Sequence, residues 1–220
     1  MLYTTILCSI LLAAPYTNAD DQSAPAKHPV LGVGMSGSGL FAVYHLGVLD
    51  TLIEAGVINP GHSVMAGASG GAIMALHTCL GLNPRHTFDH LDTMLQSCAA
   101  APTTCPLADM TSFGAHVMNA MLLVAPQPWE RCIGRAHVHV ALVDDVPELA
   151  TDPLCPLKLR KRGWTITNFT SREDVVEAAL ATSYTPGVVG HRCAVSLRGQ
   201  PVIDGGYFDH LPCPPGSNRL

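Results

Sequence analysis

Two short stretches of this chain place residues suited to acyl chemistry among glycines. Ser69 lies in GASGG at residues 67–71, which fits the pattern G-x-S-x-G. A serine hydroxyl is a poor nucleophile unless a base takes its proton and nearby donors stabilise the oxyanion that forms. Asp204 lies in PVIDGG at residues 201–206, after an apolar run. It is a candidate for that base, although the same pattern also fits an ordinary Asp-Gly-Gly turn.

A glycine-rich turn precedes the serine by about thirty residues. It ends with Gly37, Ser38 and Gly39, directly before an apolar segment that reads as a helix. The backbone N–H groups of such a turn can stabilise an oxyanion, because no side chain blocks their approach. Residues 32–37 also spell G-x-G-x-x-G, which would suit a dinucleotide, but Glu54 at the required spacing falls inside the predicted helix. The sequence therefore favours the oxyanion interpretation over the nucleotide one.

The surrounding segments predict strands that alternate with helices. Strands are expected at residues 29–33, 63–66, 135–143 and 164–169, with a hairpin over 192–204 that ends on Asp204. Helices are expected at residues 40–55, 70–80, 84–97, 110–123 with a break at Gly114, and 172–183. Ser69 then lies at a strand-to-helix corner, which is the context that G-x-S-x-G requires. The alternation predicts a layered α/β fold.

The order of the three motifs resembles that of the patatin-like phospholipase family, over about residues 30–212. YHLGVLDTL at residues 44–52 resembles the helix after the glycine turn in the family's animal triacylglycerol-lipase branch. AALATSYTPGVVG at residues 178–190 resembles the family's A-x-x-A-S-x-x-x-P segment. The resemblance implies a three-layer α/β/α patatin-like fold with a central, mostly parallel sheet.

The resemblance also implies a mechanism that uses a Ser-Asp dyad without histidine. Ser69 attacks the carbonyl of a fatty-acyl ester, and Asp204 accepts the hydroxyl proton. The amides of Gly37, Ser38 and Gly39 hold the oxyanion, and water later releases the acyl group from the serine. Such a base must be partly desolvated, because an exposed carboxylate is too weak. The implied activity is that of a lipase or phospholipase A, with an acyl lipid as substrate and no metal or organic cofactor.

Two departures from the family's pattern leave other functions open. Ala42 stands where the animal branch has a third glycine, and Leu40 lies where patatins proper carry a basic residue. One alternative is a patatin-like protein that stores or binds lipid without turnover. The other is a Ser-His-Asp esterase with His210 as base and Asp144 or Asp174 as acid, because α/β-hydrolases use that chain order.

The N-terminus predicts passage through the secretory pathway. The apolar run at residues 2–15 has the length of a signal peptide, and Thr17-Asn18-Ala19 offers small residues for cleavage. The run is too short and too interrupted for a stable membrane span. We therefore predict a signal peptide at residues 1–19, a flexible spacer at 20–28 and one patatin-like acyl hydrolase domain at 29–220. The predicted location is secreted or luminal.

The cysteines and a sequon agree with this location. Seven cysteines remain after cleavage, so in an oxidising compartment some should pair and at least one should stay unpaired or bind another chain. The sequence leaves their pairing open. Asn168 begins the sequon Asn-Phe-Thr, which is a possible glycosylation site.

Charge and histidine content limit the partners that the chain can have. Its 220 residues carry a formal net charge of -5, which gives no electrostatic attraction to nucleic acid. His86 and His90 have helical i, i+4 spacing, but Thr87 stands where a zinc protease motif has glutamate, so no metal site is predicted. His137 and His139 are expected on the outer face of a strand. No feature identifies a protein partner.

Two further segments allow a lipid-related interpretation. The basic stretch KLRKRG at residues 158–163 is expected to be a solvated loop, with contact to anionic lipid headgroups as the alternative. The methionine-rich helix at residues 110–123 is expected to pack in the core, with an acyl channel as the alternative. Contact with a membrane or lipid-droplet surface is therefore possible for this protein.

Overall fold

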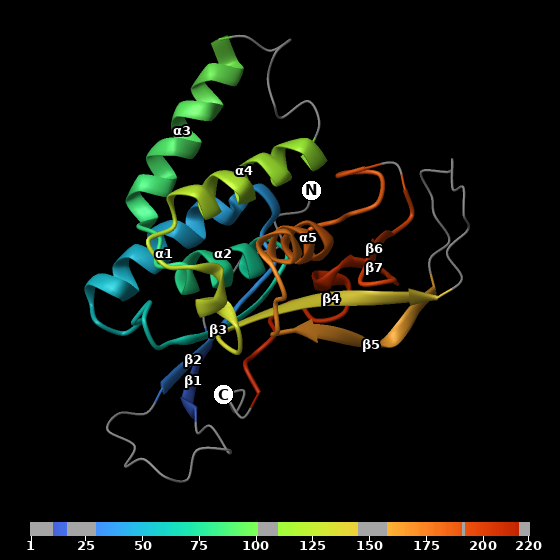
Figure 1. The fold of residues 1–220 in the computed structure, drawn as a ribbon, viewed down its shortest axis with the longest axis horizontal. Coiled ribbons are helices and arrows are strands. Elements are labelled where there is room, and N and C mark those ends of the chain that lie inside the picture. Colours follow the sequence, from blue (N-terminus) through green and yellow to red (C-terminus); the bar gives the residue numbers. More distant parts are fainter. Residues whose placement is uncertain (1–10, 17–29, 101–109, 145–157, 191, 216–220) are drawn as a thin grey trace, which may run out of the picture.

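The computed structural model describes residues 11–16, 30–100, 110–144, 158–190 and 192–215 (Figure 1). The strands are β1 (Leu11–Tyr16), β2 (Val30–Met35), β3 (Val64–Ala68), β4 (Ala136–Asp144), β5 (Lys158–Ile166), β6 (Val195–Leu197) and β7 (Gln200–Asp204). The α-helices are α1 (Ala42–Glu54), α2 (Gly70–Cys79), α3 (Pro84–Ala100), α4 (Met110–Val124) and α5 (Arg172–Thr182). Short 3-10 helices are η1 (Gly39–Phe41), η4 (Trp129–Cys132) and η5 (Gly205–Tyr207).

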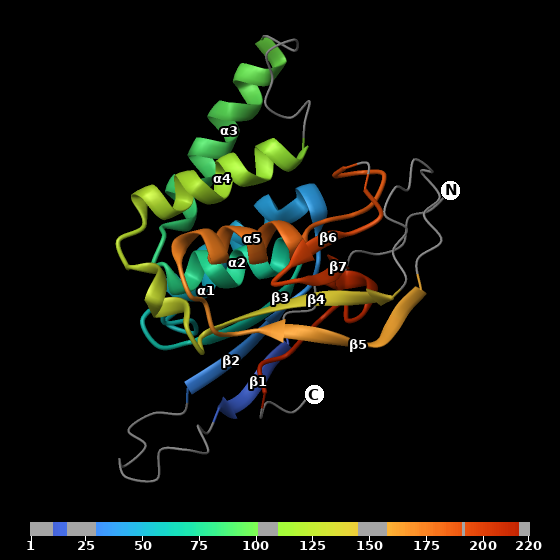
Figure 2. The same ribbon diagram turned by 45° about the vertical axis from the view of Figure 1, so that its right-hand side comes forward.

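The strands form a single sheet with a parallel centre. β2, β3 and β4 pair in parallel, whereas β1, β5, β6 and β7 join their neighbours in antiparallel orientation. Helices α2 and α5 contact the sheet, and α1 and α4 lie beyond them (Figures 1 and 2). The predicted α/β fold, with central parallel strands and flanking helices, is confirmed.

The register of β4 explains how this strand holds three partners. β3 pairs with residues 136–139, β7 with residues 140–142 and β5 with residues between 138 and 144. Because a strand residue has one neighbour on each edge, β5 occupies one edge of β4 and the other two strands share the opposite edge. β3 ends opposite His139, and β7, which runs the other way, ends opposite Val140. The C-terminal ends of β3 and β7 therefore meet head to head.

Three local predictions prove wrong. The stretch at residues 158–163 belongs to β5 rather than to a loop, because its backbone pairs with β4. Helix α4 continues through Gly114, which packs closely on α5: a Cβ there would lie 3.0 Å from a methyl carbon of Leu180. His137 is buried and His139 half-buried, so the face of β4 opposite the core residues Val138 and Val140 is covered at these positions rather than exposed.

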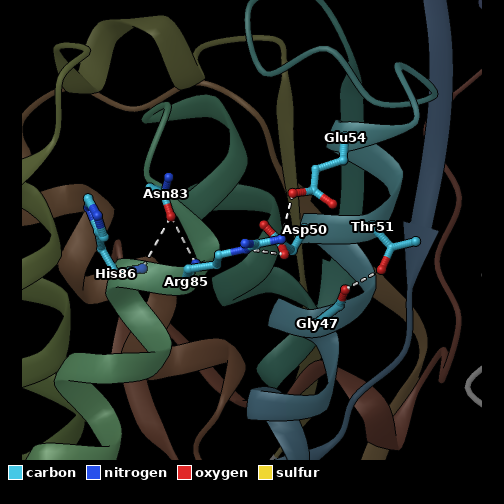
Figure 3. Close-up of polar contacts among 7 residues, drawn as sticks. All are labelled: Gly47, Asp50, Thr51, Glu54, Asn83, Arg85 and His86. Carbon is cyan, nitrogen blue, oxygen red and sulfur yellow. Dashed lines mark hydrogen bonds and ion pairs between the residues drawn. The ribbon is translucent and has the colours of Figure 1, made fainter.

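Helix α3 is fastened to α1 by one arginine (Figure 3). Nε of Arg85 donates to Asp50 at 2.7 Å, and a terminal nitrogen of Arg85 donates to Glu54 at 2.5 Å. The carboxamide oxygen of Asn83 accepts from the amides of Arg85 and His86 and so caps the N-terminus of α3. Exposed ion pairs contribute only about 0–1 kcal/mol each, so Arg85 serves mainly to orient the two helices. A hollow of about 630 Å³ lies between them.

Cysteine pairing is partly visible. Cys79 at the end of α2 forms a disulfide with Cys132 in η4, with the two Cα atoms 5.1 Å apart. Cys193 is also disulfide-bonded, and Cys213 is a free thiol. The expectation that some cysteines pair is confirmed. Cys105 and Cys155 lie outside the described residues.

The N-terminal region bears on the predicted processing. Residues 11–16 form the edge strand β1 beside β2, although they belong to the predicted signal peptide. The predicted cleavage site after Ala19 and the predicted spacer lie outside the described residues. Within the described parts of the chain, no helix is both long and apolar enough to cross a bilayer.

Candidate active site

Ser69 occupies a sharp corner between β3 and α2. Its φ of 53° lies in the left-handed region that non-glycine residues seldom adopt. Its neighbours must be small: a Cβ on Gly67 would lie 2.2 Å from the carbonyl carbon of Gly71. A Cβ on Gly71 would lie 2.3 Å from the carbonyl oxygen of Met35. The glycines of the motif therefore let β3 turn directly into α2 and hold the serine at the end of the sheet.

Asp204 meets Ser69 because β3 and β7 end head to head. The serine hydroxyl lies near enough to the Asp204 carboxylate to act on its pKa as a hydrogen-bond donor, which lowers it. Gly205, the next residue, lies against β4: a Cβ there would be 2.1 Å from the carbonyl oxygen of His139. The Asp-Gly-Gly turn thus needs its first glycine for this close approach, and the two predicted catalytic residues lie together.

The Asp204 carboxylate is buried and has several donors. It is 7% exposed. The Gly206 amide donates to Oδ1 at 2.8 Å, and the Thr185 hydroxyl lies 3.4 Å from Oδ2. Burial raises the pKa of Asp204, while hydrogen bonds from Ser69, Gly206 and Thr185 and the charge of His210 oppose part of the shift. The net pKa is above the usual aspartate value, which makes this carboxylate a stronger base.

The glycine turn lies directly on the serine corner. A Cβ on Gly37 would be 3.4 Å from Cβ of Ser69, and a Cβ on Gly70 would be 2.5 Å from Oγ of Ser38. The amide of Gly37 donates to the carbonyl oxygen of His210 at 3.3 Å. In the part of the chain that the structure describes, no carbonyl pairs with the amides of Ser38 and Gly39. Two of the three predicted oxyanion donors are therefore free to donate to a ligand.

One of the two departures from the family pattern, Ala42, lies next to the serine corner. Ala42 begins α1, and its Cβ would be 3.3 Å from a Cβ on Gly70. The extra methyl group of Ala42 therefore lies beside the serine corner and fills space there. The side chain of Leu40 lies outside the described part of the structure.

Two threonines that the sequence reasoning did not single out support the corner. The Thr182 hydroxyl accepts from the Ser69 amide at 3.0 Å and donates to the carbonyl oxygen of His139. Thr185 contacts Asp204. Both residues lie in the segment AALATSYTPGVVG, so a search of that segment for hydroxyl side chains could have found them.

The residues of the alternative triad do not come together in the same way. Asp174 lies in the first turn of α5, about 12 Å along the helix from Thr182, and it pairs with Arg198 at 2.6 Å. Asp144 lies about 13 Å along β4 from Val140. His210 lies near Asp204, since a Cβ on Gly206 would be 3.8 Å from its Nδ1. Of the acids named for a triad or a dyad, Asp204 is therefore the one that lies near both His210 and Ser69.

Comparison with known families decides where the chain belongs. Residues 34–215 match the family model for patatin-like phospholipase. The chain belongs to the patatin-like phospholipase family. No curated protein matches it significantly. Membership of the patatin-like family supports lipid acyl hydrolase activity in general and fits an acyl lipid as the substrate.

The patatin-like match covers every residue brought together at the corner. It begins at Gly34, near the end of β2 and before the glycine turn, and continues beyond His210. The dinucleotide alternative fits this domain poorly, because residues 32–35 lie in β2. A Cβ on Gly34 would be 2.5 Å from the carbonyl oxygen of Pro212, so the protein itself fills that space.

Proposed function

We propose that this patatin-like domain hydrolyses fatty-acyl esters of lipids through a Ser69–Asp204 dyad and an acyl-enzyme. The observation that carries the proposal is the meeting of the C-terminal ends of β3 and β7, which places the Ser69 hydroxyl beside a buried carboxylate of raised pKa. A serine becomes nucleophilic when such a base accepts its proton. Unpaired amides and the N-terminus of α2 lie beside it, where negative charge would develop.

The reaction follows from these positions. Asp204 accepts the hydroxyl proton as Oγ of Ser69 bonds to the ester carbonyl carbon. The amides of Ser38 and Gly39 donate to the resulting oxyanion, and that of Gly37 joins them if it leaves His210. The C–O bond to the alcohol then breaks, and the alcohol leaves with the proton from Asp204. A water molecule activated by the same carboxylate releases the fatty acid and restores the serine.

The surroundings of the dyad favour a substrate presented at a lipid surface. Phe41 and Tyr44 follow the glycine turn and are 62% and 59% exposed. Val188 follows the Thr185 segment at 70% exposed, and Tyr207 follows Asp204 at 51%. Exposed apolar side chains on three segments next to one site are typical of an interaction surface. We propose that they contact the membrane or lipid droplet from which the substrate comes.

A secretory location is proposed on separate grounds. The apolar N-terminal run and the sequon at Asn168, whose residue is exposed, suit passage through the secretory pathway. The Cys79–Cys132 disulfide suits an oxidising compartment. The proposed setting for hydrolysis is therefore luminal or extracellular.

The test compares four proteins on the same substrates. Wild type, Ser69→Ala, Asp204→Asn and His210→Ala are assayed on medium-chain p-nitrophenyl esters and on long-chain lipid micelles. We expect the first two variants to lose turnover and His210→Ala to keep it. Loss with His210→Ala and survival with Asp204→Asn would replace the dyad by a histidine base. A folded wild type without turnover or fluorophosphonate labelling would favour the non-catalytic, lipid-binding alternative.

A further inference from the structure

Ser38, the serine in the glycine turn, contacts the buried histidine His45. Oγ of Ser38 lies 3.3 Å from Nδ1 of His45, within hydrogen-bond reach. His45 lies in the first turn of α1 and is 1% exposed. Its position between the turn and the core means that a contact to Ser38 links the turn to the rigid part of the domain.

The same hydroxyl also touches the nucleophile's helix. A Cβ on Gly70 would be only 2.5 Å from Oγ of Ser38, so Gly70 must lack a side chain for the hydroxyl to lie there. Ser38 Oγ is thus enclosed between His45 and the residue that follows Ser69. Burial lowers the pKa of His45, so at neutral pH the ring makes this contact without placing a charge beside the oxyanion.

A fixed side chain at Ser38 also fixes the backbone on either side of it. The carbonyl oxygen of Ser38 accepts from the Phe41 amide at 3.0 Å, which closes η1. With Oγ held at His45 and the carbonyl held at Phe41, the peptide groups that carry the amides of Ser38 and Gly39 have one orientation. Donors aimed in advance at a developing oxyanion stabilise it without reorganisation.

We propose that His45 is a positioning residue, which through the Ser38 hydroxyl holds the Ser38 and Gly39 amides toward Ser69. The proposal rests on the proposed function, because the amides matter only if an oxyanion forms there. His45 touches neither the substrate nor the reacting atoms. Its effect is to keep the turn in the conformation that accepts the oxyanion.

The test uses the full chain with substitutions on both sides of the contact. Ser38→Ala removes the hydroxyl from a partly exposed position and should fold. His45→Asn keeps a polar atom near Nδ1, and Ser38→Thr keeps the hydroxyl. The control is Thr51→Ala, because Thr51 carries an exposed hydroxyl on the same helix that bonds only to Gly47 among its described contacts. Ester hydrolysis and amide hydrogen exchange at Phe41 are measured for each protein.

We expect Ser38→Ala to lower kcat by about 10- to 100-fold with KM changed by less than about twofold, because misplaced donors weaken only the transition state. The Phe41 amide should exchange at least about tenfold faster, because the turn opens more often. Ser38→Thr should restore most of kcat, and Thr51→Ala should match wild type. Ser38→Ala/His45→Asn should be no worse than Ser38→Ala, since the two groups act as a unit.

Two results would overturn the proposal, and a third separates it from the proposed function. Wild-type kcat and wild-type Phe41 exchange in Ser38→Ala would show that the contact positions nothing. Fluorophosphonate attached to Ser38 rather than Ser69 would make Ser38 and His45 a nucleophile-base pair instead. If wild type hydrolyses no ester, the proposed function fails, and Phe41 exchange alone then decides whether His45 holds the turn.

Discussion

The backbone of Ser69 is strained, because its φ is positive. A non-glycine residue at positive φ costs about 1–3 kcal/mol, and such residues persist where the surrounding structure holds them. Here the holding groups are Thr182, which accepts from the Ser69 amide, and the close contact between Gly67 and Gly71. The strained conformation places the hydroxyl next to Asp204. The same conformation that would make Ser69 reactive therefore lowers the stability of the folded protein.

The cost of the strain in free energy of unfolding can be measured with two variants that both lack the hydroxyl. We expect Ser69→Gly to have a free energy of unfolding about 1 kcal/mol higher than Ser69→Ala, because only glycine adopts this φ without a Cβ clash. Urea unfolding of the two variants gives the difference directly. Equal stabilities would mean that the corner relaxes when the hydroxyl is lost.

The raised pKa of Asp204 predicts how stability depends on pH. The folded state holds the Asp204 proton at pH values where the unfolded state, with a pKa near 3.8, has lost it. Stability from this group is therefore complete below pH 3.8 and is lost as pH rises through the folded-state pKa. Asp204→Asn, which cannot ionise, should be more stable than wild type at pH 7, with the gap closing as pH falls.

Unfolding of both proteins in urea at several pH values checks this prediction. The rate of ester hydrolysis by wild type, measured over the same pH values, should fall on acidification, because the protonated carboxyl cannot act as base. A gap that is constant with pH would show that Asp204 keeps an ordinary pKa in the folded protein.

At the scale of elements, close backbone contacts hold the corner. In Gly71→Ala the new Cβ would meet carbonyl oxygens of Met35 and Ser36, at 2.3 and 2.6 Å, and backbone atoms cannot rotate away as side chains do. We expect a loss of about 1–3 kcal/mol in the free energy of unfolding. Gly47→Ala is the matched control, because its Cβ meets nothing within 4 Å.

The control variant Gly47→Ala should have a higher free energy of unfolding than wild type. Gly47 lies inside α1, where alanine is favoured over glycine by about 0.5–1 kcal/mol. Thermal unfolding of the two variants beside wild type compares them. A Gly71→Ala protein as stable as Gly47→Ala would mean that α2 can move away from the glycine turn.

The elements that could be predicted from the sequence are those specified locally. The corner at Ser69 depends on a few neighbouring residues, and the structure has it. The predicted helices α3 and α5 likewise begin at local caps, Asn83 and Ser171. The start of β5 could not be predicted in this way, because a basic stretch becomes a strand only through pairing with β4. Likewise, the burial of His137 depends on what packs against its face of the sheet, which the alternation of residues along β4 does not encode.

The residues of the site could be predicted from the sequence, but their proximity in space could not. Ser69 and Asp204 each stand out by their glycine neighbours, and the family resemblance implied that they work together. Their contact depends on β3 and β7 sharing one edge of β4, which no local pattern encodes. Thr182 supports Ser69 across 113 residues of sequence, and a contact over that separation leaves no periodicity to detect.

At the scale of the whole molecule, one disulfide closes a long loop. Cys79 and Cys132 are 53 residues apart, and a cross-link of that span stabilises by about 4 kcal/mol in the chain-entropy description. We expect the Cys79→Ala/Cys132→Ala variant to lose stability of this order in urea unfolding. Reduced wild type serves as the comparison, and equal stability with and without the bond would show that the α2–η4 contact is sufficient.

The N-terminal segment is either cleaved as a signal peptide or kept in the sheet as β1. If cleavage follows Ala19, as we predict, the mature chain begins at Asp20 and β2 becomes the edge of the sheet in place of β1. N-terminal sequencing of the protein secreted from eukaryotic cells decides between them. A secreted chain that keeps residues 11–16 would mean that the predicted domain boundary is wrong and that the domain includes β1.

The meeting of β3 and β7 has a mechanical consequence. The two strands share an edge of β4 but run end to end, so no ladder of hydrogen bonds joins one to the other. The sheet therefore contains a seam, spanned by β4, with the serine on one side and the aspartate on the other. Loosening β4 at His139 and Val140 would let the two halves part while each kept its own pairing. Whatever chemistry the pair performs should then fail at denaturant concentrations below those that unfold the core, making activity an early reporter of strain at the seam.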